Sequence, residues 1–425
     1  MIGMLTTQRK RMTNLTSRII DTCQISSSKN LESFLFVGYV PPVNQMRLVE
    51  HRPTEETMYP LELLYCPDSH LVQISCEVDP SILFPVDYPY TSGTTRILRE
   101  NFADLFKQSK EFFGLNEKSF VIDIGSNDGT LLSNFLKGGC QVLGIDPTDK
   151  IEIANASGIR SIMGFFNKKT AGKVLKEYGQ ADQITAANVF AHMKDIDDVL
   201  DGIRLLLKDD GVFVSENHYL LDLIQTLQYD TIYHEHLRYY SLHALKYLME
   251  KHGLEIFRIK RILTHGGSIR VFSARKGTKK IHESVEVTLQ EEHGAGLLNI
   301  ATYRKFARDV VQTKLDLIAM LRDIRAKGHK VYGIGAPSRA STLISYVGLD
   351  HLTIDCVVEI KGSHKIGKYM PGTLIPVCDE TVLYEEQPEY ALLLSWHISK
   401  ELITNLKKRG FKGKFIIPLP QPVIV

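Results

Sequence analysis

The chain has 425 residues, of which 44% are hydrophobic and 24% are charged. This composition is typical of a globular protein with two or three domains. Its 51 basic and 49 acidic residues leave a formal net charge of +2, which provides no strong field for a nucleic acid or an anionic membrane, so neither is an expected partner.

The N-terminus and the cysteines indicate the compartment. Residues 1–14 are polar and basic, which predicts a frayed tail without the apolar core of a signal peptide. No window approaches the roughly eighteen consecutive apolar residues that a membrane-spanning helix requires. Six scattered cysteines are too few for a disulfide framework. We therefore expect a cytoplasmic protein with reduced thiols.

Three folded parts follow the tail. Residues 15–85 carry short apolar runs broken by proline and polar clusters, which predicts a small strand-containing lobe. Residues 86–275 alternate apolar strands with helical segments, the pattern of a parallel sheet wound by helices. Residues 276–329 predict a charged linker with a connecting helix over 303–327, and residues 330–425 repeat the alternation. The predicted fold class is α/β, with a Rossmann-like domain and a second, smaller C-terminal Rossmann-like domain.

A glycine turn follows the first strand of the larger domain. The segment "VIDIGSNDGTLL" predicts a buried strand, a turn at residues 125–129 and a helix that begins near Thr130. Glycines let backbone N–H groups at a helix N-terminus approach a ligand. Asp146 ends the next strand, where an acid can accept hydrogen bonds from ribose hydroxyls. An adenosine-containing cofactor is therefore expected, the alternative being a loop that only turns the chain.

Charge distinguishes between the adenosine compounds. Asp128 lies inside the turn, where its carboxylate opposes an anionic pyrophosphate and favours a cationic or zwitterionic ligand. S-adenosylmethionine (SAM) therefore fits better than NAD. The predicted cofactor-binding residues are Asp123, Gly125, Ser126, Asn127, Asp128, Gly129, Asp146 and Asn188.

A cluster of proton-handling side chains lies further along the chain. The segment "YDTIYHEHLRYYSL" places Tyr233, His234, Glu235 and His236 side by side. Alone, such a cluster is more often a solvated surface. This one follows a strand and a helix, in a region where open α/β sheets bind substrates, and His192 follows another strand end. Converging imidazoles and phenols would supply a base and hydrogen-bond donors beside a sulfonium methyl group.

A family resemblance is carried by the segments "DIGSNDGTLL", "NVFAHM", "DTIYHEHLRYYSL", "THGGSIRVF", "GIGAPSRASTLISYVGL" and "FIIPLPQPVIV". From about Cys23 to the last residue, the chain resembles the SAM-dependent C-methyltransferases of nucleotide-linked 4-keto-6-deoxy sugars. The resemblance implies a class I methyltransferase domain and transfer of a methyl group to C-3 in branched deoxysugar biosynthesis. A ketone at C-4 acidifies the C-3 proton, and removal of that proton gives an enolate that attacks the methyl group.

The matching motifs also imply roles for the cluster. His236 is the expected base, while Tyr233, Glu235 and His192 orient the sugar or stabilise the enolate, and these roles can be exchanged. An extended segment would place His234 on the same face as His236, whereas a helix would fan the four side chains apart. Because not all four can reach one sugar, we expect His234 to be structural.

A second glycine turn, "YGIGAPSRAST", precedes a helix in the C-terminal domain. Helix N-terminal N–H groups with a guanidinium and hydroxyls suit the pyrophosphate of a nucleotide sugar, and a turn kept only for packing is the alternative. In the resembling family the nucleotide lies between the two α/β domains. The predicted substrate-binding residues are Tyr88, Tyr90, Arg339, Ser341, Thr342, Trp396 and His397.

The N-terminal lobe departs from the family pattern. The family usually holds zinc there through two C-x-x-C pairs, but the matching segments read "CQIS" and "CPDS", with Ser26 and Ser69 in place of two cysteines. The remaining Cys23 and Cys66, with His70 as a third candidate donor, fall short of the four ligands of a structural zinc site. No metal is expected.

Three alternatives stay open. An O- or N-methyltransferase acting on a related sugar would need no enolate stabilisation. A catalytically silent nucleotide-sugar binding protein would bind without turnover, although the intact "YHEH" segment argues against it. An NAD-dependent oxidoreductase is disfavoured by Asp128. The oligomeric state is not predicted.

Overall fold

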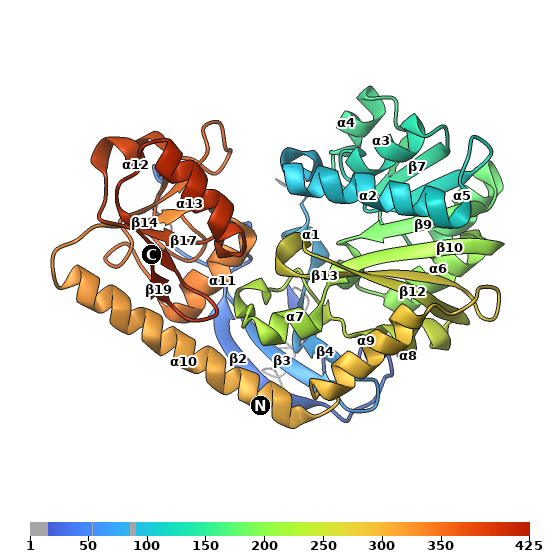
Figure 1. Ribbon diagram of the computed structural model, residues 1–425, viewed down its shortest axis with the longest axis horizontal. Helices are drawn as coiled ribbons and strands as arrows, with labels where there is room; N and C mark the ends of the chain where they lie inside the picture. Colours follow the sequence, from blue (N-terminus) through green and yellow to red (C-terminus); the bar gives the residue numbers. More distant parts are fainter. Residues whose placement is uncertain (1–15, 53, 86–90) are drawn as a thin grey trace, which may run out of the picture.

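The computed structural model describes residues 16–52, 54–85 and 91–425. Within these ranges the strands form four sheets. Two of them are α/β sheets that stand side by side, and the strands of the N-terminal lobe lie between and below them (Figure 1). This arrangement places the lobe in contact with both halves of the molecule.

The N-terminal lobe is built from antiparallel strands. Its larger sheet has the order β11-β4-β3-β2. The outer strand β11 follows residues 233–236 in the sequence, and its Arg238 pairs with Gln73 and its Tyr239 with Val72. The cluster is therefore anchored to the lobe by the strand that follows it. The elements are β1 (Ser17–Ile19), β2 (Glu32–Val40), β3 (Tyr59–Cys66), β4 (Leu71–Ile74), β5 (Cys76–Val78), α1 (Pro80–Leu83) and β11 (Arg238–Tyr239).

The first α/β sheet has the order β12-β13-β10-β9-β6-β7-β8. Its strands from β6 to β10 are parallel, while β13 and β12 continue the sheet in antiparallel pairing. The strands are β6 (Phe120–Ile124), β7 (Gln141–Asp146), β8 (Ser161–Met163), β9 (Ala181–Ala187), β10 (Leu207–His218), β12 (Leu254–Ile262) and β13 (Ser268–Arg275).

Helices cover both faces of this sheet, because the strand residues are apolar on both sides. In β6, Val121 packs into a core with Leu105 and Phe135, whereas the next residue, Ile122, packs into the opposite core with Leu200. The helices are η1 (Ser92–Thr94), α2 (Arg96–Phe113), α3 (Thr130–Lys137), α4 (Ile151–Ala156), α5 (Lys168–Tyr178), η2 (Phe190–His192), α6 (Ile196–Leu206), α7 (Leu220–Gln225), η3 (Tyr229–Thr231), α8 (Leu242–Lys251) and η4 (Thr264–Gly266).

Two helices connect the halves. α9 (Glu283–Gly294) is followed by α10 (Ile300–Arg325), a long helix that crosses the molecule beneath the lobe (Figure 1). Phe306, Val310 and Leu317 are buried at helical spacing, so α10 presents an apolar stripe to β2 and α11. The helix begins three residues before the predicted Tyr303 and ends two residues before the predicted Lys327.

The second α/β sheet has the order β16-β15-β14-β17-β18-β19 and is parallel except for β19. Its elements are β14 (Val331–Ile334), α11 (Ser338–Val347), β15 (Cys356–Glu359), β16 (Val377–Asp379), α12 (Thr381–Glu386), β17 (Tyr390–Leu393), η5 (Trp396–Ile398), α13 (Ser399–Lys408), β18 (Lys414–Ile417) and β19 (Val423–Ile424).

The predicted α/β fold class, with two α/β sheets and a small lobe, is confirmed. The antiparallel edge made by β13 and β12 and the pairing of β11 with the lobe were not predicted. β13 is buried on both faces like the parallel strands, so its pattern does not reveal its antiparallel pairing, and a strand of two residues has no period to detect. Among the described residues, no helix is both long enough and apolar enough to cross a membrane.

Candidate active site

Residues 233–236 form a tight turn, rather than the strand or helix considered from the sequence. The His236 amide donates to the Tyr233 carbonyl oxygen over 2.9 Å. Next to the turn, the Arg238 guanidinium donates to the Met193 carbonyl oxygen over 2.6 Å. The turn is thus fixed against the loop that follows β9, at the carboxyl edge of the first α/β sheet.

The His236 ring has a defined tautomer. Its Nδ1 lies 2.9 Å from the Thr231 carbonyl oxygen, and because a carbonyl only accepts, Nδ1 carries the hydrogen and Nε2 carries the lone pair in the neutral ring. The Tyr233 ring lies 4.2 Å from the His236 ring, centroid to centroid. An imidazole and a phenol are therefore in contact, with their ring planes tilted by 32°.

The surroundings fix the protonation of both groups. Burial, with further contributions from His192, His265 and Arg339, lowers the pKa of His236 well below its ordinary value, so the imidazole is neutral at pH 7. Burial and the charge of Glu235 raise the pKa of Tyr233 well above its ordinary value, so the phenol keeps its proton. The pair can accept one proton and donate a hydrogen bond to an oxyanion.

His192 and Glu235 lie on the other side of the turn. Nδ1 of His192 donates to the Glu235 carbonyl oxygen over 2.5 Å, which leaves its Nε2 as an acceptor. The His192 ring is 4.9 Å from the His236 ring, and burial lowers its pKa. The Glu235 carboxylate accepts from Nδ2 of Asn44 over 2.7 Å. Glu235 therefore links the turn to the N-terminal lobe.

His234 points into the lobe instead. Its Nε2 donates to the Pro60 carbonyl oxygen over 3.1 Å, and its ring packs edge-on against Tyr59 at 5.8 Å. Among the described residues its buried Nδ1 has no hydrogen-bond partner.

Two histidines that the sequence analysis did not assign complete the group. His218 ends β10, and its ring lies 5.3 Å from His236 and stacks on His265 at 5.4 Å. His265 adopts a left-handed backbone with φ of 57°. His218 could have been predicted as a site residue because it ends a strand. His265 could not, because it reaches the histidine cluster only through the antiparallel edge of the sheet.

The first glycine turn lies at the carboxyl end of β6. Gly129 has φ of 77°, and a Cβ there would approach the Ile159 side chain to 2.8 Å. The Asp146 carboxylate accepts from the Asn127 amide over 2.9 Å. The Asp128 carboxylate accepts from the Gly93 amide over 2.8 Å. Both acids therefore hold the turn in shape, and Asp128 ties it to η1.

Two buried polar side-chain atoms at this edge of the sheet have no hydrogen-bond partner among the described residues. They are Oγ of Ser126 and Oδ1 of Asn188. Burial, together with Asp146 and Glu216, raises the pKa of Asp123 to about 8 against an opposing hydrogen bond from Thr185. A raised pKa keeps Asp123 largely protonated, so the acids that disfavour a pyrophosphate here and fit the sulfonium and ammonium groups of SAM are Asp128 and Asp146.

The polar residues of the second glycine turn are engaged within the protein. Arg339 donates through Nε and Nη2 to the two oxygens of Asp230, over 2.7 and 2.8 Å. Oγ of Ser341 donates to the Val43 carbonyl oxygen over 3.3 Å, and Oγ1 of Thr342 donates to a carbonyl in the 229–233 segment over 2.9 Å. All three side chains are buried. This turn docks the C-terminal half onto the lobe and onto the 229–233 segment.

Trp396 and His397 lie on the same side. Nε1 of Trp396 donates to the Asp230 carboxylate over 2.7 Å, and the Arg339 guanidinium lies over the indole at 4.9 Å. Burial and the charge of Arg339 lower the pKa of His397 to about 3. Tyr88 and Tyr90 lie outside the described residues.

At the position of the family's zinc site, the lobe has a quartet of side chains made of Cys23, Ser26, Cys66 and Ser69. Sγ of Cys23 lies 3.1 Å from Oγ of Ser69, and Sγ of Cys66 lies 3.7 Å from Oγ of Ser26. His70 is engaged with the Tyr65 hydroxyl at 3.0 Å. Two thiols and two hydroxyls do not fit a structural zinc ion, and the described residues contain no group of three or more candidate ligands.

Comparison with sequence families covers most of the chain. Residues 263–420 match a family described as C-methyltransferase C-terminal domain, and residues 96–259 match one described as methyltransferase domain. Residues 23–84 match a family described as a zinc binding domain. The C-methyltransferase NovU of Streptomyces niveus is 32% identical over 413 residues, which are 96% of this chain and 97% of that protein.

Solved structures are more distant. A SAM-dependent methyltransferase of Anabaena variabilis is 16% identical and covers 42% of this chain and 86% of its own, with a TM-score of 0.33. The 1,6-didemethyltoxoflavin-N1-methyltransferase of Burkholderia thailandensis, bound to S-adenosylhomocysteine, is 17% identical and covers 42% and 77%, with a TM-score of 0.32.

Proposed function

Because the chain belongs to the SAM-dependent C-methyltransferases, we propose that its acceptor is a nucleotide-linked 4-keto-6-deoxy sugar that receives the methyl group at C-3. The observation that carries this proposal is the contact of His236, held by its Nδ1 hydrogen bond to Thr231, with the Tyr233 ring 4.2 Å away, centroid to centroid. A base next to an oxyanion donor is what carbon methylation alpha to a ketone requires. The motifs shared with the sugar-methylating enzymes support the choice of substrate.

SAM is the cofactor, and when bound it supplies a methyl group on a sulfonium. The residues that would hold it are at the carboxyl edge of the first α/β sheet. Asp146 would accept from its ribose, and the unpartnered Ser126 and Asn188 side chains would bond its polar groups. We assign the first α/β sheet to the cofactor and the C-terminal sheet to help hold the nucleotide sugar.

Proton removal is assigned to His236. Its Nε2 lone pair takes the C-3 proton, and the C–H electron pair moves into the enolate, with the negative charge on the C-4 oxygen. The Tyr233 hydroxyl donates a hydrogen bond to that oxygen. The carbon then forms its new bond to the methyl group, while the C–S electrons return to sulfur. The hydrogen bond from His236 Nδ1 to Thr231 aims the ring throughout.

His192 and Glu235 are assigned to positioning the sugar and the 233–236 turn. Nε2 of His192 can accept from a sugar hydroxyl, because its Nδ1 is already committed to the Glu235 carbonyl oxygen. The Glu235 carboxylate, held by Asn44, keeps the turn in register with the lobe.

The test incubates the protein with SAM and a panel of nucleotide-linked 4-keto-6-deoxy sugars. We expect a product heavier by one methylene, with the new methyl carbon bonded to C-3 by NMR. A methyl group on oxygen or nitrogen would instead identify an O- or N-methyltransferase.

A second measurement separates catalysis from silent binding. In heavy water without SAM, an active base should exchange the C-3 hydrogen of the correct sugar for deuterium, and His236→Ala should abolish that exchange. Binding of the sugar without exchange or transfer by the wild-type protein would leave a binding protein as the better description.

A further inference from the structure

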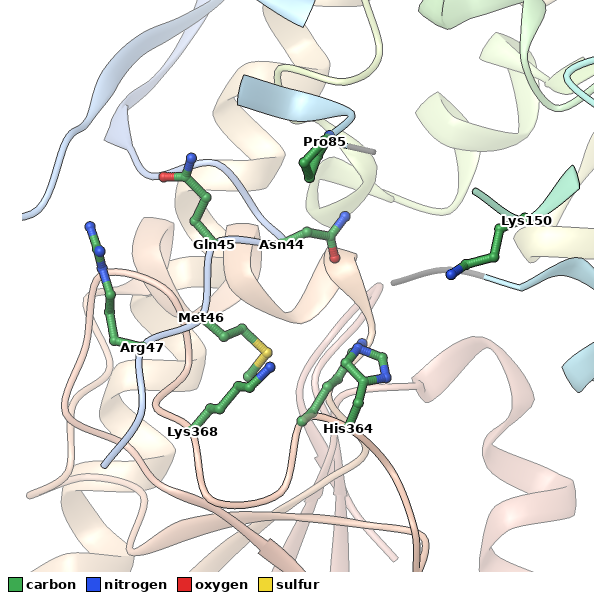
Figure 2. A pocket seen from close by; sticks show the side chains of 9 residues that line it. Asn44, Gln45, Met46, Arg47, Pro85, Lys150, His364 and Lys368 are labelled. Carbon is green, nitrogen blue, oxygen red and sulfur yellow. The ribbon is translucent and has the colours of Figure 1, made fainter. Parts of the chain in front are cut away.

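A basic pocket lies where the three parts of the molecule meet. Its volume is about 690 Å³, within the range of small-molecule sites. It is formed by a loop of the lobe, a loop of the C-terminal half and the segment that follows β7 (Figure 2). The lining residues are Asn44, Gln45, Met46, Arg47, Pro85, Lys150, His364, Lys365 and Lys368.

The lining is strongly cationic. It includes Arg47, Lys150, Lys365 and Lys368, and among the lining residues that the structure describes there is no acid. Figure 2 shows Lys150 and Lys368 on opposite sides of the space, with the His364 ring between them. Burial lowers the pKa of His364, and Lys365, Lys368 and Lys150 lower it further. The positive fields of three separate lysines therefore converge in this pocket.

Nearby carboxylates neutralise only part of this charge. Glu56 lies 3.6 Å from Arg47, and Asp149 lies 2.9 Å from Lys150. Nζ of Lys365 donates to the Ala336 carbonyl oxygen over 2.6 Å, and the charges of Glu359 and Glu235 reach it. None of these acids is among the described residues that line the pocket, so the lining keeps a positive charge that suits an anion.

One end of the pocket meets the candidate active site. Asn44 lines the pocket and donates to the Glu235 carboxylate over 2.7 Å. Pro85 also lines it, and the preceding residue, Phe84, packs edge-on against His192 at 5.6 Å. A ligand with its charged part in the pocket would therefore extend its other end toward the 233–236 turn.

We propose that this pocket binds the diphosphate of a nucleoside diphosphate, the activated carrier of the substrate, with Lys150, Lys365 and Lys368 as the principal cations. This inference deepens the proposed function and rests on it for the sugar. It relocates the phosphates from the second glycine turn, whose Arg339, Ser341 and Thr342 side chains already bond to the protein.

The experiment measures binding without turnover. The full chain, saturated with S-adenosylhomocysteine, is titrated calorimetrically with the diphosphates of thymidine, uridine, guanosine, cytidine and adenosine, and with inorganic pyrophosphate. We expect at least one nucleoside diphosphate to bind with an affinity that falls as salt rises. Inorganic pyrophosphate should bind at least tenfold more weakly, because it lacks the nucleoside.

Matched variants locate the site. Lys368→Gln and Lys150→Gln should each weaken the nucleoside diphosphate at least tenfold, while the affinity for S-adenosylhomocysteine stays unchanged. Lys173→Gln, on the exposed face of α5, is the control and should bind as the wild type does. Unfolding temperatures of all three variants verify that the chain folds.

Each outcome decides the proposal. Unchanged affinity in both pocket variants, or no binding of any nucleoside diphosphate, would overturn it. Pyrophosphate binding as tightly as the nucleoside diphosphates would overturn the assignment to a nucleotide carrier. If a nucleoside diphosphate binds in the pocket but no sugar is methylated, the proposed function fails while this site stands. If Lys150→Gln and Lys368→Gln still transfer the methyl group with an unchanged KM, the proposed function stands while this site fails.

Discussion

The two glycine turns of this molecule have the same strand-turn-helix design but use their polar groups differently. At residues 125–129, Ser126 has a buried hydroxyl without a partner in the described structure. At residues 335–342, Arg339 and Thr342 bond to the 229–233 segment. A glycine turn after a strand is therefore not enough to identify a ligand site. The surfaces packed against the turn decide whether its polar groups face a ligand or another part of the protein.

The largest loss of activity is expected from replacing His236. The charge of Arg339, in the second turn, helps to lower the pKa of His236. Loss of a general base typically lowers the rate about 10²- to 10⁴-fold. We therefore expect His236→Ala to lower kcat within that range while calorimetric affinity for S-adenosylhomocysteine stays that of the wild type. His234→Ala, whose ring contacts the lobe, is the matched control. A fully active His236→Ala enzyme would remove the base assignment.

A large loss of stability is expected when the docking role of the second turn is broken. Arg339→Met leaves the buried Asp230 carboxylate without its cation, which typically lowers the free energy of unfolding by about 3–5 kcal/mol. Arg409→Met removes an equally bidentate pair with Glu380 in which the guanidinium is about half exposed, so only about 0–1 kcal/mol is expected. Denaturant unfolding measures both. Equal stability of the two variants would contradict the docking role.

One substitution in each glycine turn, with a smaller expected effect, tests whether the turn serves ligand binding or stability. Ser126→Ala should weaken S-adenosylhomocysteine by about 0.5–1.5 kcal/mol, or about two- to twelvefold, without lowering the unfolding temperature. Thr342→Val should do the reverse, because it leaves the Ile232 carbonyl oxygen without its donor. Calorimetric titration and thermal unfolding of each variant give the comparison. If both variants changed only stability, the first turn would be structural as well.

The pH dependence of catalysis tests the protonation of the base. The base works when it is deprotonated, and the pKa of His236 lies well below its ordinary value of about 6.5. As pH falls, kcat/KM should therefore hold through pH 6.5 and decline only below it. S-adenosylhomocysteine affinity measured over the same range separates this limb from cofactor binding. A decline centred near or above pH 6.5 would show that another group controls the reaction.

The smallest effect is expected from metal removal. Because the lobe has two thiols and two hydroxyls at the quartet, we expect the purified protein to contain no stoichiometric zinc and a chelator to leave its unfolding temperature unchanged. The double variant Ser26→Cys with Ser69→Cys should acquire zinc and become sensitive to the chelator. One zinc per wild-type chain by elemental analysis would overturn this expectation.

Much of the fold could be predicted from the sequence. Apolar runs such as "FVIDIG" and "CQVLGID", separated by helical periodicity, predicted the first α/β sheet and the turn that carries Ser126, and runs such as "LTIDCVVE" and "YALLLSW" predicted the second sheet. The bounds of α10 also came close, because a buried stripe at helical spacing is a local property. The residue types of the 233–236 cluster indicated proton transfer only together with their place after a strand and a helix of the expected α/β sheet.

Local sequence alone determined the α/β class, the position of the glycine turns and the presence of imidazoles and phenols near strand ends, because each depends on neighbours within a few residues. Only the tertiary structure decided which groups meet. It bound Arg339 to Asp230, brought His265 beside His218, and gathered Arg47, Lys150 and Lys368 from three parts of the chain into one pocket. Hydrogen bonding, burial and electric fields depend on distance in space, and separation along the chain does not report it.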